Sequence, residues 1–503
     1  MRFPLTKLPA LPALRHWTIF GAALMLPLLT MLAHPASAAP PKPPAPPNPP
    51  SSPMPLPPAA APPATAPPSA APSATAPPAN GGQAFPFPVT ERTLANGLKV
   101  YVVGFDSPGL VAFYSVVRTG SRNEVEPGKS GFAHFFEHLM FRGSEKYTAD
   151  KYTAVIKEMG ADSNAYTSDD LTVYHILAGK AALPKIVEIE ADRFQRLQYE
   201  DAKFQKEARA VLGEYNKNAS NPIQKLVETL YDNAFTTHTY KHTTMGFLRD
   251  IENMPKELAY SRQFFDRYYR PENVILLVVG DAEPEAVFKL VEKHYGEWKR
   301  GGKHPVVPFE PPQKQEKRAA LTWKGATLPL LLEGYHAPAF STTNVDVPTL
   351  DVLAELLFSE RAPLYKQLVI KEQKVETLAG SNDAHVDPNL FTVLARIKKP
   401  ADLASVEKAI HDEMGRIARE GVDEKTLAEV LSHVKYAFAG QLSTADRTAN
   451  TAASFLALTG DLGSMNAYFA LYDKVTSADV KRVAGKVFTP KNRTVVTMKA
   501  DKP

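Results

Sequence analysis

The chain has 503 residues, which is enough for several domains, and its 58 Lys and Arg against 54 Asp and Glu give a formal charge of +4. These charges are spread along the chain without a basic block, so the composition excludes a typical nucleic-acid-binding protein. The absence of cysteine excludes disulfides and a lipid-modified cysteine, so an exported chain of this kind must be held together by its cores.

The first 38 residues have the features of an export signal. Basic residues precede the apolar run WTIFGAALMLPLLTML (17–32), and small residues precede an expected cleavage after Ala38. The run is shorter than the ~20 apolar residues that span a bilayer, and Pro27 interrupts it. We therefore predict a signal peptide (1–38) and a periplasmic or secreted protein with no transmembrane span after cleavage. An uncleaved membrane anchor is the alternative.

Proline and alanine dominate residues 39–83, where Lys42 is the only charged residue. Such a segment cannot bury enough apolar surface to offset the entropy of the chain, and its prolines favour an extended, semi-rigid coil. We predict a disordered linker, either a spacer across the cell envelope or a simple leader.

Strand and helix patterns alternate after this linker. Residues 97–104 and 110–120 are rich in β-branched and aromatic side chains and are bounded by glycines, so we expect them to form paired strands. Residues 131–141 contain no helix breaker after Gly131, so they are predicted to form a helix. Apolar side chains at three- and four-residue spacing predict two more helices, over 182–198 and 201–218. The class is mixed α and β.

An internal repeat relates two parts of the chain. YRPENVILLVVGD (269–281) and FTPKNRTVVTMKAD (488–501) each close a unit of a helix followed by a strand, and they align at an offset of 219 residues. We therefore expect two halves, residues 84–310 and residues 311–503.

The segment GFAHFFEHLMF (131–141) combines an apolar pattern with two histidines and a glutamate. At the same offset, the second half has only leucines at the equivalent positions. The three pairs are His134 and Leu353, Glu137 and Leu356, and His138 and Leu357. This contrast suggests a packing helix that one half has adapted for chemistry.

In an α-helix, His134 and His138 stand one turn apart on the same face and can direct both imidazoles at one point. This spacing suits Zn²⁺, and Glu137 borders the same point, where it could accept a proton from a zinc-bound water. The order His-x-x-Glu-His is the inverzincin motif. Chance occurrence of so short a motif is the alternative.

A catalytic zinc needs a third protein ligand. In EARAVLGE (207–214), Glu207 and Glu214 lie two helical turns apart and share a face. Glu214 is the candidate ligand and Glu207 a candidate neighbour of the metal. The alternative is that both are ordinary solvated residues of a surface helix.

Several motifs in the same order resemble the pitrilysin/insulinase superfamily, metallopeptidase family M16, which includes the mitochondrial processing peptidase and its bacterial relatives. The resemblance covers essentially residues 88–500. The motifs are ANGLKVYVV (95–103), RTGSRNE (118–124), GFAHFFEHLMFRGSEKY (131–147), GADSNAYTSDDLTVYHI (160–176), EARAVLGE and YYRPENVILLVVGD (268–281).

The resemblance implies an α+β fold of two homologous αβ halves, each an antiparallel-rich sheet packed with helices, that form a clamshell around a chamber. It also implies a zinc metalloendopeptidase that hydrolyses peptides or unfolded segments with a zinc-activated water. In this family the matching residues are zinc ligands (His134, His138 and Glu214), the general base (Glu137) and an additional glutamate at the catalytic centre (Glu207).

The resemblance implies that Asn164 and Ala165, in NAYTSDD, contact the backbone of an extended substrate at a sheet edge. Family members often supply an arginine and a tyrosine from the second half. Here Arg361 and Tyr365 are present, but Thr377 stands nearest to the position where the family has a tyrosine. We therefore expect either a self-sufficient homodimer or a heterodimer in which a second M16-type subunit completes the site.

The remaining histidines have simpler interpretations. His175 is expected in a strand, and His238 and His242 are expected in a loop rather than in a metal pair.

The alternative function is a non-cleaving peptide-binding or assembly subunit of an M16-type complex, and a purely structural envelope protein would leave the triad unexplained.

Overall fold

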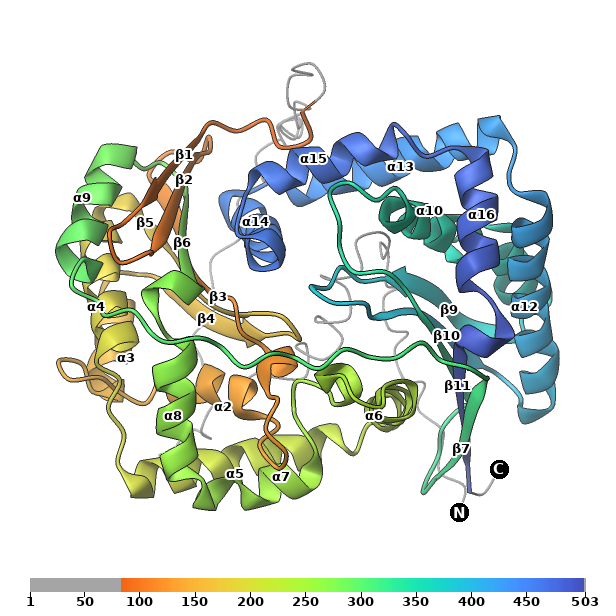
Figure 1. Ribbon diagram of the computed structural model, residues 1–503, viewed down its shortest axis with the longest axis horizontal. Coiled ribbons are helices and arrows are strands. Elements are labelled where there is room, and N and C mark those ends of the chain that lie inside the picture. Colours follow the sequence, from red (N-terminus) through yellow and green to blue (C-terminus); the bar gives the residue numbers. More distant parts are fainter. Residues whose placement is uncertain (1–82, 502–503) are drawn as a thin grey trace, which may run out of the picture.

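The computed structural model describes residues 83–501, which form two β-sheets surrounded by helices (Figure 1). The predicted signal peptide and the linker up to residue 82 lie outside the described residues. The predicted fold class, an α+β chain of two related αβ halves around a central cavity, is confirmed.

The first sheet has six strands in the order β1-β2-β6-β3-β5-β4. They are β1 (Val89–Thr93), β2 (Lys99–Gly104), β3 (Leu110–Val117), β4 (Asp162–Thr167), β5 (Thr172–Gly179) and β6 (Val274–Gly280). The prediction that 97–104 and 110–120 pair with each other is wrong, because β6 lies between β2 and β3 and pairs with both. Strand β6 is buried on both faces and therefore takes a central position in the sheet.

Helices follow and separate these strands. They are α2 (Phe132–Leu139), α3 (Ala149–Glu158), α4 (Leu183–Gln195), α5 (Asp201–Asn218), α6 (Pro222–Ala234), α7 (Leu248–Asn253), α8 (Leu258–Tyr268) and α9 (Pro284–Tyr295). The three predicted helices correspond to α2, α4 and α5. The chain from 301 to 314 then crosses to the second sheet without forming a helix or strand (Figure 1).

The second sheet has five strands in the order β7-β11-β8-β10-β9. They are β7 (Lys317–Trp323), β8 (Leu330–His336), β9 (Val375–Asn382), β10 (Leu390–Ile397) and β11 (Arg493–Ala500). The helices of this half are α10 (Asp346–Phe358), α11 (Pro363–Tyr365), α12 (Leu403–Glu420), α13 (Glu424–Gln441), α14 (Ala445–Thr459), α15 (Gly463–Tyr472) and α16 (Ser477–Val487). No helix within residues 83–501 is long and apolar enough to cross a membrane.

The two halves each place one helix on the other half's sheet (Figure 1). Helix α14 packs on β3 and β6 of the first sheet, whereas α6 packs on β7, β8 and β11 of the second. A row of small residues lets α14 approach the sheet closely, since Ala449, Ala452 and Ala453 are fully buried. This exchange joins the halves through one apolar core that includes residues of both sheets.

The repeat detected in the sequence has a structural counterpart. Asn273 and Asn492 each follow a helix and precede the strand of their unit, and each side-chain amide donates a 2.9 Å hydrogen bond to the carbonyl oxygen of the residue five positions earlier. The leucines at the positions equivalent to the triad lie in α10, where Leu353 and Leu357 are fully buried. The equivalent of the motif helix therefore serves packing in the second half.

Candidate metal centre

The N-terminus of α2 is held by a buried carboxylate. Gly131, the residue before the helix, has a φ of 92° and no capping side chain. Glu124 replaces that cap, because its two oxygens accept hydrogen bonds of 2.7 Å from the backbone N–H groups of Gly131 and Ala133. Burial raises the pKa of Glu124 to about 8 against these hydrogen bonds.

A close backbone contact also fixes the start of this helix. A Cβ atom on Gly131 would lie 2.7 Å from the carbonyl oxygen of Met245, and one on Gly246 would lie 2.6 Å from the nitrogen of Gly131. Both positions have positive φ angles, so glycine is required there for two reasons.

Helix α2 divides its side chains between core and cavity. Its apolar face follows helical spacing, with Phe132, Phe135, Phe136 and Leu139 almost completely buried. His134 and His138 project from another face, with their ring centroids 4.8 Å apart. The i and i+4 spacing therefore brings the two imidazoles together, as predicted from the sequence.

Glu214 of α5 meets both histidines. Its Oε2 atom lies 3.2 Å from Nε2 of His138 and 3.8 Å from Nε2 of His134. One ligand atom from each of the three residues lies within 4.8 Å of the others. Two donor atoms that share a tetrahedral zinc stand roughly 3.3 Å apart, which is close to these separations.

The other nitrogen of His138 faces Glu207. Nδ1 of His138 lies 3.2 Å from Oε1 of Glu207, and Arg142 contacts both oxygens of the same carboxylate, at 2.9 Å through Nη2 and 2.5 Å through Nε. Glu207 is buried and does not line the cavity. It is therefore placed to orient His138 rather than to meet a substrate.

The pKa values of the two histidines are shifted in opposite directions. Burial lowers the pKa of His134. Burial also opposes protonation of His138, but the hydrogen bonds with Glu207 and Glu214 outweigh it and raise the pKa of His138 to about 10.

Glu137 lies on the same turn of α2 as the histidines. Its Oε2 atom accepts a 2.7 Å hydrogen bond from the hydroxyl of Thr167, the last residue of β4. Glu137 lines a cavity of about 490 Å³ together with His134 and Glu214.

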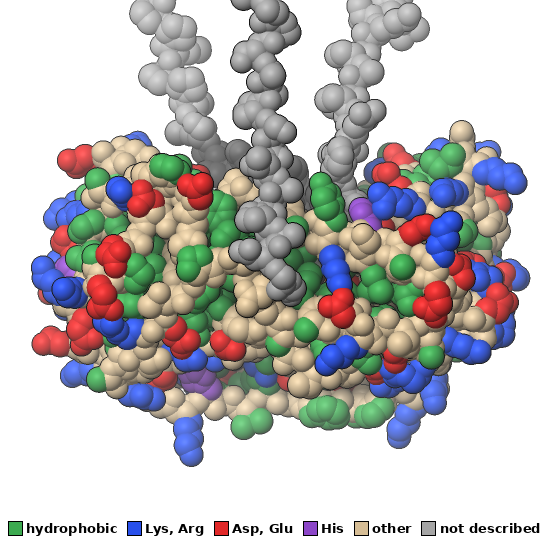
Figure 2. Space-filling model, turned by 90° about the horizontal axis from the view of Figure 1, so that it is seen from above, with side chains coloured by type: hydrophobic (Ala, Val, Ile, Leu, Met, Phe, Trp, Pro, Cys, Tyr) green, Lys and Arg blue, Asp and Glu red, His purple; other side chains and the backbone are tan. Residues whose placement is uncertain are grey.

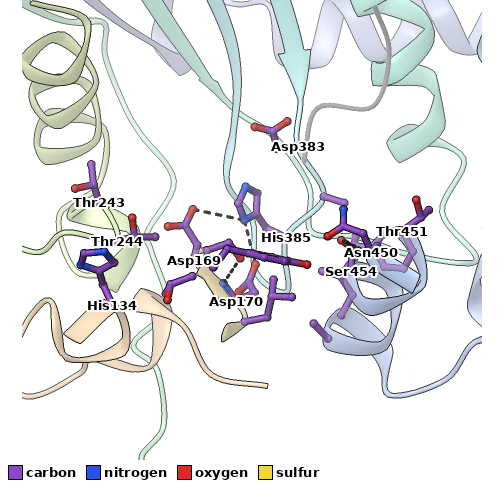
Figure 3. Close-up of a pocket in the computed structure, with 18 of the residues that line it drawn as sticks. His134, Asp169, Asp170, Thr243, Thr244, Asp383, His385, Asn450, Thr451 and Ser454 are labelled. Carbon is purple, nitrogen blue, oxygen red and sulfur yellow. Dashed lines mark hydrogen bonds and ion pairs between the residues drawn. The ribbon is translucent and has the colours of Figure 1, made fainter. Parts of the chain in front are cut away.

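This cavity extends from His134, Glu137 and Glu214 toward the second half. Figure 3 shows His134, Thr243 and Thr244 on one side, Asn450, Thr451 and Ser454 on the opposite side, and Asp169, Asp170 and His385 between them. His385 joins the halves, since its Nδ1 atom lies 3.0 Å from Oδ2 of Asp170. Outside the cavity, basic and acidic side chains are interspersed over the face in Figure 2.

Asn164 and Ala165 lie on β4, which forms one edge of the first sheet. Helix α2 packs beside this strand. Asn164 is exposed, and β4 pairs only with β5 among the described strands. An unpaired strand edge therefore runs beside the three converging side chains.

The second-half residues considered for this site lie elsewhere. Arg361 lines a different cavity, beside Glu355 and His433, and neither Tyr365 nor Thr377 lines the cavity that contains His134. The arginine that lines this cavity is Arg447 of α14.

The other histidines have separate partners. His175 lies in β5 and stacks on Tyr114, as expected for a strand residue. His238 and His242 flank the short helix η4 (Thr239–Lys241), and the first pairs with Asp387 at 2.9 Å whereas the second lies 3.0 Å from the carbonyl oxygen of Thr243. The two imidazoles do not converge on one point, which agrees with the prediction that they lie in a loop rather than form a metal pair.

A second cluster of metal-compatible residues already has protein partners. It comprises Glu333, Glu407 and His411. The carboxylate of Glu333 accepts from the hydroxyl of Tyr335 and contacts His411 at 2.7 Å, and Glu407 pairs with Arg318. This cluster is a satisfied ion-pair network.

Sequence reasoning missed the cavity residues Thr167, His385 and Arg447, and also the capping role of Glu124. Only Thr167 and Glu124 lie in motifs that had been singled out. Their roles depend on contacts between segments that are distant in sequence, which no local pattern reveals.

Comparison with known proteins agrees with this geometry. Residues 111–247 match the family described as Insulinase (Peptidase family M16), and residues 258–433 match the Peptidase M16 inactive domain. The zinc protease PqqE of Helicobacter pylori is 29% identical over 413 residues, which cover 81% of this chain and 92% of that protein. The mitochondrial-processing peptidase subunit beta of Bos taurus is 30% identical over 182 residues, or 36% of each chain.

Solved structures show the same fold. The crystal structure of a protease from Helicobacter pylori has a TM-score of 0.77 and 29% identity, and the match covers 82% of this chain and 99% of that one. The periplasmic protease PqqL from Escherichia coli has a TM-score of 0.69 at 18% identity, over 82% of this chain and 47% of that one. With two matching family domains and relatives named as zinc proteases, the chain belongs to peptidase family M16.

Proposed function

We propose that this protein is an exported zinc metalloendopeptidase that hydrolyses peptides or unfolded polypeptide segments. The observation that carries the proposal is the convergence of two imidazole nitrogens and one carboxylate oxygen on one point at the wall of a cavity. Export rests on the sequence of residues 1–38, and the printed name of the similar periplasmic protease PqqL agrees with it.

The donor set fits zinc better than a harder cation. Two neutral imidazoles and one carboxylate are the ligand types of catalytic zinc sites, whereas Ca²⁺ and Mg²⁺ prefer oxygen ligands throughout. His134, His138 and Glu214 would hold the ion and leave a coordination position toward the cavity. Zinc bound there would supply a Lewis acid for the scissile carbonyl and lower the pKa of a coordinated water toward ~7.

Glu137 is the proposed general base. It lines the cavity together with His134 and Glu214, so its carboxylate is available to accept the proton of the attacking water and then pass it to the leaving amine. Glu207 acts in the proposed mechanism through His138, by fixing the imidazole that it contacts and raising its basicity as a ligand.

The substrate is proposed to bind as an added strand on β4. Asn164 and Ala165 would contact its backbone, and main-chain hydrogen bonds of this kind give affinity with little sequence preference. The cavity would then receive the scissile bond beside Glu137.

The proposed oligomeric state depends on which residues of the second half reach the cavity. Neither Arg361 nor Tyr365 lines the cavity, whereas Arg447 of the second half does, so we propose either a self-sufficient homodimer or a heterodimer in which a second M16-type chain completes the site. The printed names of two relatives, a subunit of the mitochondrial-processing peptidase and a subunit of the cytochrome b-c1 complex, describe proteins that work in assemblies.

The alternative is a non-cleaving peptide-binding or assembly subunit of an M16-type complex. The family name of the second matching domain, which calls it inactive, keeps this alternative open for the second half. The complete set of His134, Glu137, His138 and Glu214 in the first half favours cleavage.

A peptide-library digest tests the proposal. The purified chain lacking residues 1–38 is incubated with the library, with and without a chelator, and the products are identified by mass spectrometry. We expect cleavage that the chelator abolishes and that added Zn²⁺ restores. Zinc binding without cleavage of any peptide would favour the binding subunit, and cleavage that survives chelation would rule out the metal mechanism.

A further inference from the structure

The hydroxyl of Thr167 makes the hydrogen bond that Glu137 accepts in the cavity wall. The donor is Oγ1 of Thr167 and the acceptor is Oε2 of Glu137, at 2.7 Å, because an ionised carboxylate can only accept. Thr167 is 7% exposed, so bulk water competes little for this hydroxyl. A hydrogen bond to a charged group under these conditions is among the stronger ones in proteins.

The position of Thr167 is set by the sheet rather than by α2. Its backbone pairs with Thr172 at the end of the β4–β5 ladder. The turn that follows is closed by a 2.8 Å hydrogen bond from the N–H of Ser168 to the carbonyl of Leu171, and Ser121 donates to the carbonyl of Ser168. A β-branched side chain on such a backbone has few χ1 rotamers available. The hydroxyl is therefore a rigid external reference for the carboxylate on the helix.

Glu137 needs such a reference. Its side chain has three rotatable bonds, and the terminal torsion of a glutamate is broad, so packing of α2 alone does not fix the direction of the two oxygens. The hydrogen bond engages Oε2 and leaves Oε1 outside this contact. A carboxylate held in this way has one oxygen oriented for proton transfer, and catalytic groups lose rate steeply when their orientation is loose.

We propose that Thr167 is a positioning residue for the hydrolytic reaction, whose hydroxyl anchors Oε2 of Glu137 so that the other carboxylate oxygen is directed into the cavity. This role rests on the proposed function of Glu137 as the general base. It does not involve zinc ligation, because within residues 83–501 the side chain of Thr167 bonds to Glu137 and not to any of the three proposed ligands.

The test compares three single variants with the parent chain lacking residues 1–38. Thr167→Val removes the hydroxyl with little change of volume, and Thr167→Ser keeps it. Thr172→Val is the matched control, since it removes a buried threonine hydroxyl from the paired position on β5, where the bond goes to the carbonyl of Thr119 and not to Glu137. For each variant, kcat, KM, bound zinc and the midpoint of thermal unfolding are measured.

We expect Thr167→Val to lower kcat about 10- to 100-fold, the equivalent of one lost hydrogen bond to a charged group, with KM within about twofold and zinc content unchanged. Thr167→Ser should recover kcat to within about threefold, and Thr172→Val should keep the parent kcat. If Thr167→Val does not fold, Thr167→Ala removes the same hydroxyl with less bulk and is held to the same expectation.

The proposal is overturned if removal of the Thr167 hydroxyl leaves kcat unchanged in a folded, zinc-loaded chain, or if Thr167→Ser is as defective as Thr167→Val. It is also overturned if Thr172→Val causes the same loss, because the effect would then be a general one of the sheet. A parent chain that cleaves no peptide would refute the proposed function instead, so the two failures are distinguishable.

Discussion

Nε2 of His138 lies 3.2 Å from Oε2 of Glu214, although the two residues are 76 positions apart in the chain. They come together because α5 packs on α2, which in turn lies beside β4 and β5 of the first sheet. The same packing places Glu207, two turns earlier on α5, behind the imidazole of His138. One helix pair therefore supplies the proposed metal ligands and the group that orients one of them.

Replacement of Glu214 by Gln should weaken zinc binding far more than the same replacement of Glu207. The first change removes a proposed anionic ligand, and the second alters a carboxylate that contacts the ligand His138 and pairs with Arg142, for which a 10- to 100-fold loss of affinity is typical. Competition with a chromophoric chelator measures both affinities. Equal affinities in Glu214→Gln and the parent chain would exclude Glu214 as a ligand.

Arg142 should influence zinc affinity without contacting the metal site. Its guanidinium contacts both oxygens of Glu207, so Arg142→Ala frees that carboxylate to move and should lower zinc affinity about 3- to 30-fold, less than the loss expected for Glu207→Gln. Arg209→Ala is the matched control, because Arg209 lies on α5 two positions from Glu207 but bonds to Gln205. The idea fails if the two alanine variants bind zinc equally well.

His385 should make the stability of the chain depend on pH above neutrality. Burial opposes its protonation, but Asp170, Asp169 and Asp383 outweigh burial and raise the pKa of His385 to about 9. Since the folded pKa exceeds the unfolded value of about 6.5, the stabilisation is complete below pH 6.5 and is lost as the pH rises through 9.

Urea unfolding at pH 6.5 and pH 9.5 measures this effect. The free energy of unfolding of the parent chain should fall by about 1–3 kcal/mol more over this interval than that of His385→Gln. His294→Gln is the control, because burial lowers the pKa of His294 and its titration lies below this range. Identical pH dependence of the parent and His385→Gln would contradict the assignment.

The exchanged helix α14 should tolerate little added volume against the first sheet. Ala452 is fully buried, so Ala452→Leu forces the helix away from β3 and β6 and should lower the free energy of unfolding by about 1–3 kcal/mol. Ala439→Leu, at an exposed position of α13, should change it by less than about 0.5 kcal/mol. Equal unfolding midpoints of the two variants would argue against the close packing of α14.

The sequence was most informative where a pattern is local. Helical spacing identified α2, α4 and α5 and the shared face of His134 and His138. The repeat offset of 219 residues also holds for α8 and α16, which begin at Leu258 and Ser477. For α5 and α13, which begin at Asp201 and Glu424, the offset is four residues larger. Positions in the two halves can therefore be matched residue by residue only in segments where the offset is 219.

Contacts between distant segments could not be read from the sequence. A strand that begins at Val274 inserts between β2 and β3, and the short interval between those two strands gave no sign of it. The hydrogen bond from Thr167 to Glu137 and the ion pair of His385 with Asp170 likewise depend on the tertiary fold. The motif indicated the chemistry, and the packing of the sheets decides which polar groups surround it.

Measurement of bound zinc and peptide turnover together, in the parent chain and in Glu137→Gln, separates the proposed metal ligands from the proposed base. We expect one zinc ion per chain in both proteins, with turnover in the parent and a loss of at least about 1000-fold in the variant, because the ligands remain while the base is removed. Turnover by Glu137→Gln at the rate of the parent chain would contradict this expectation.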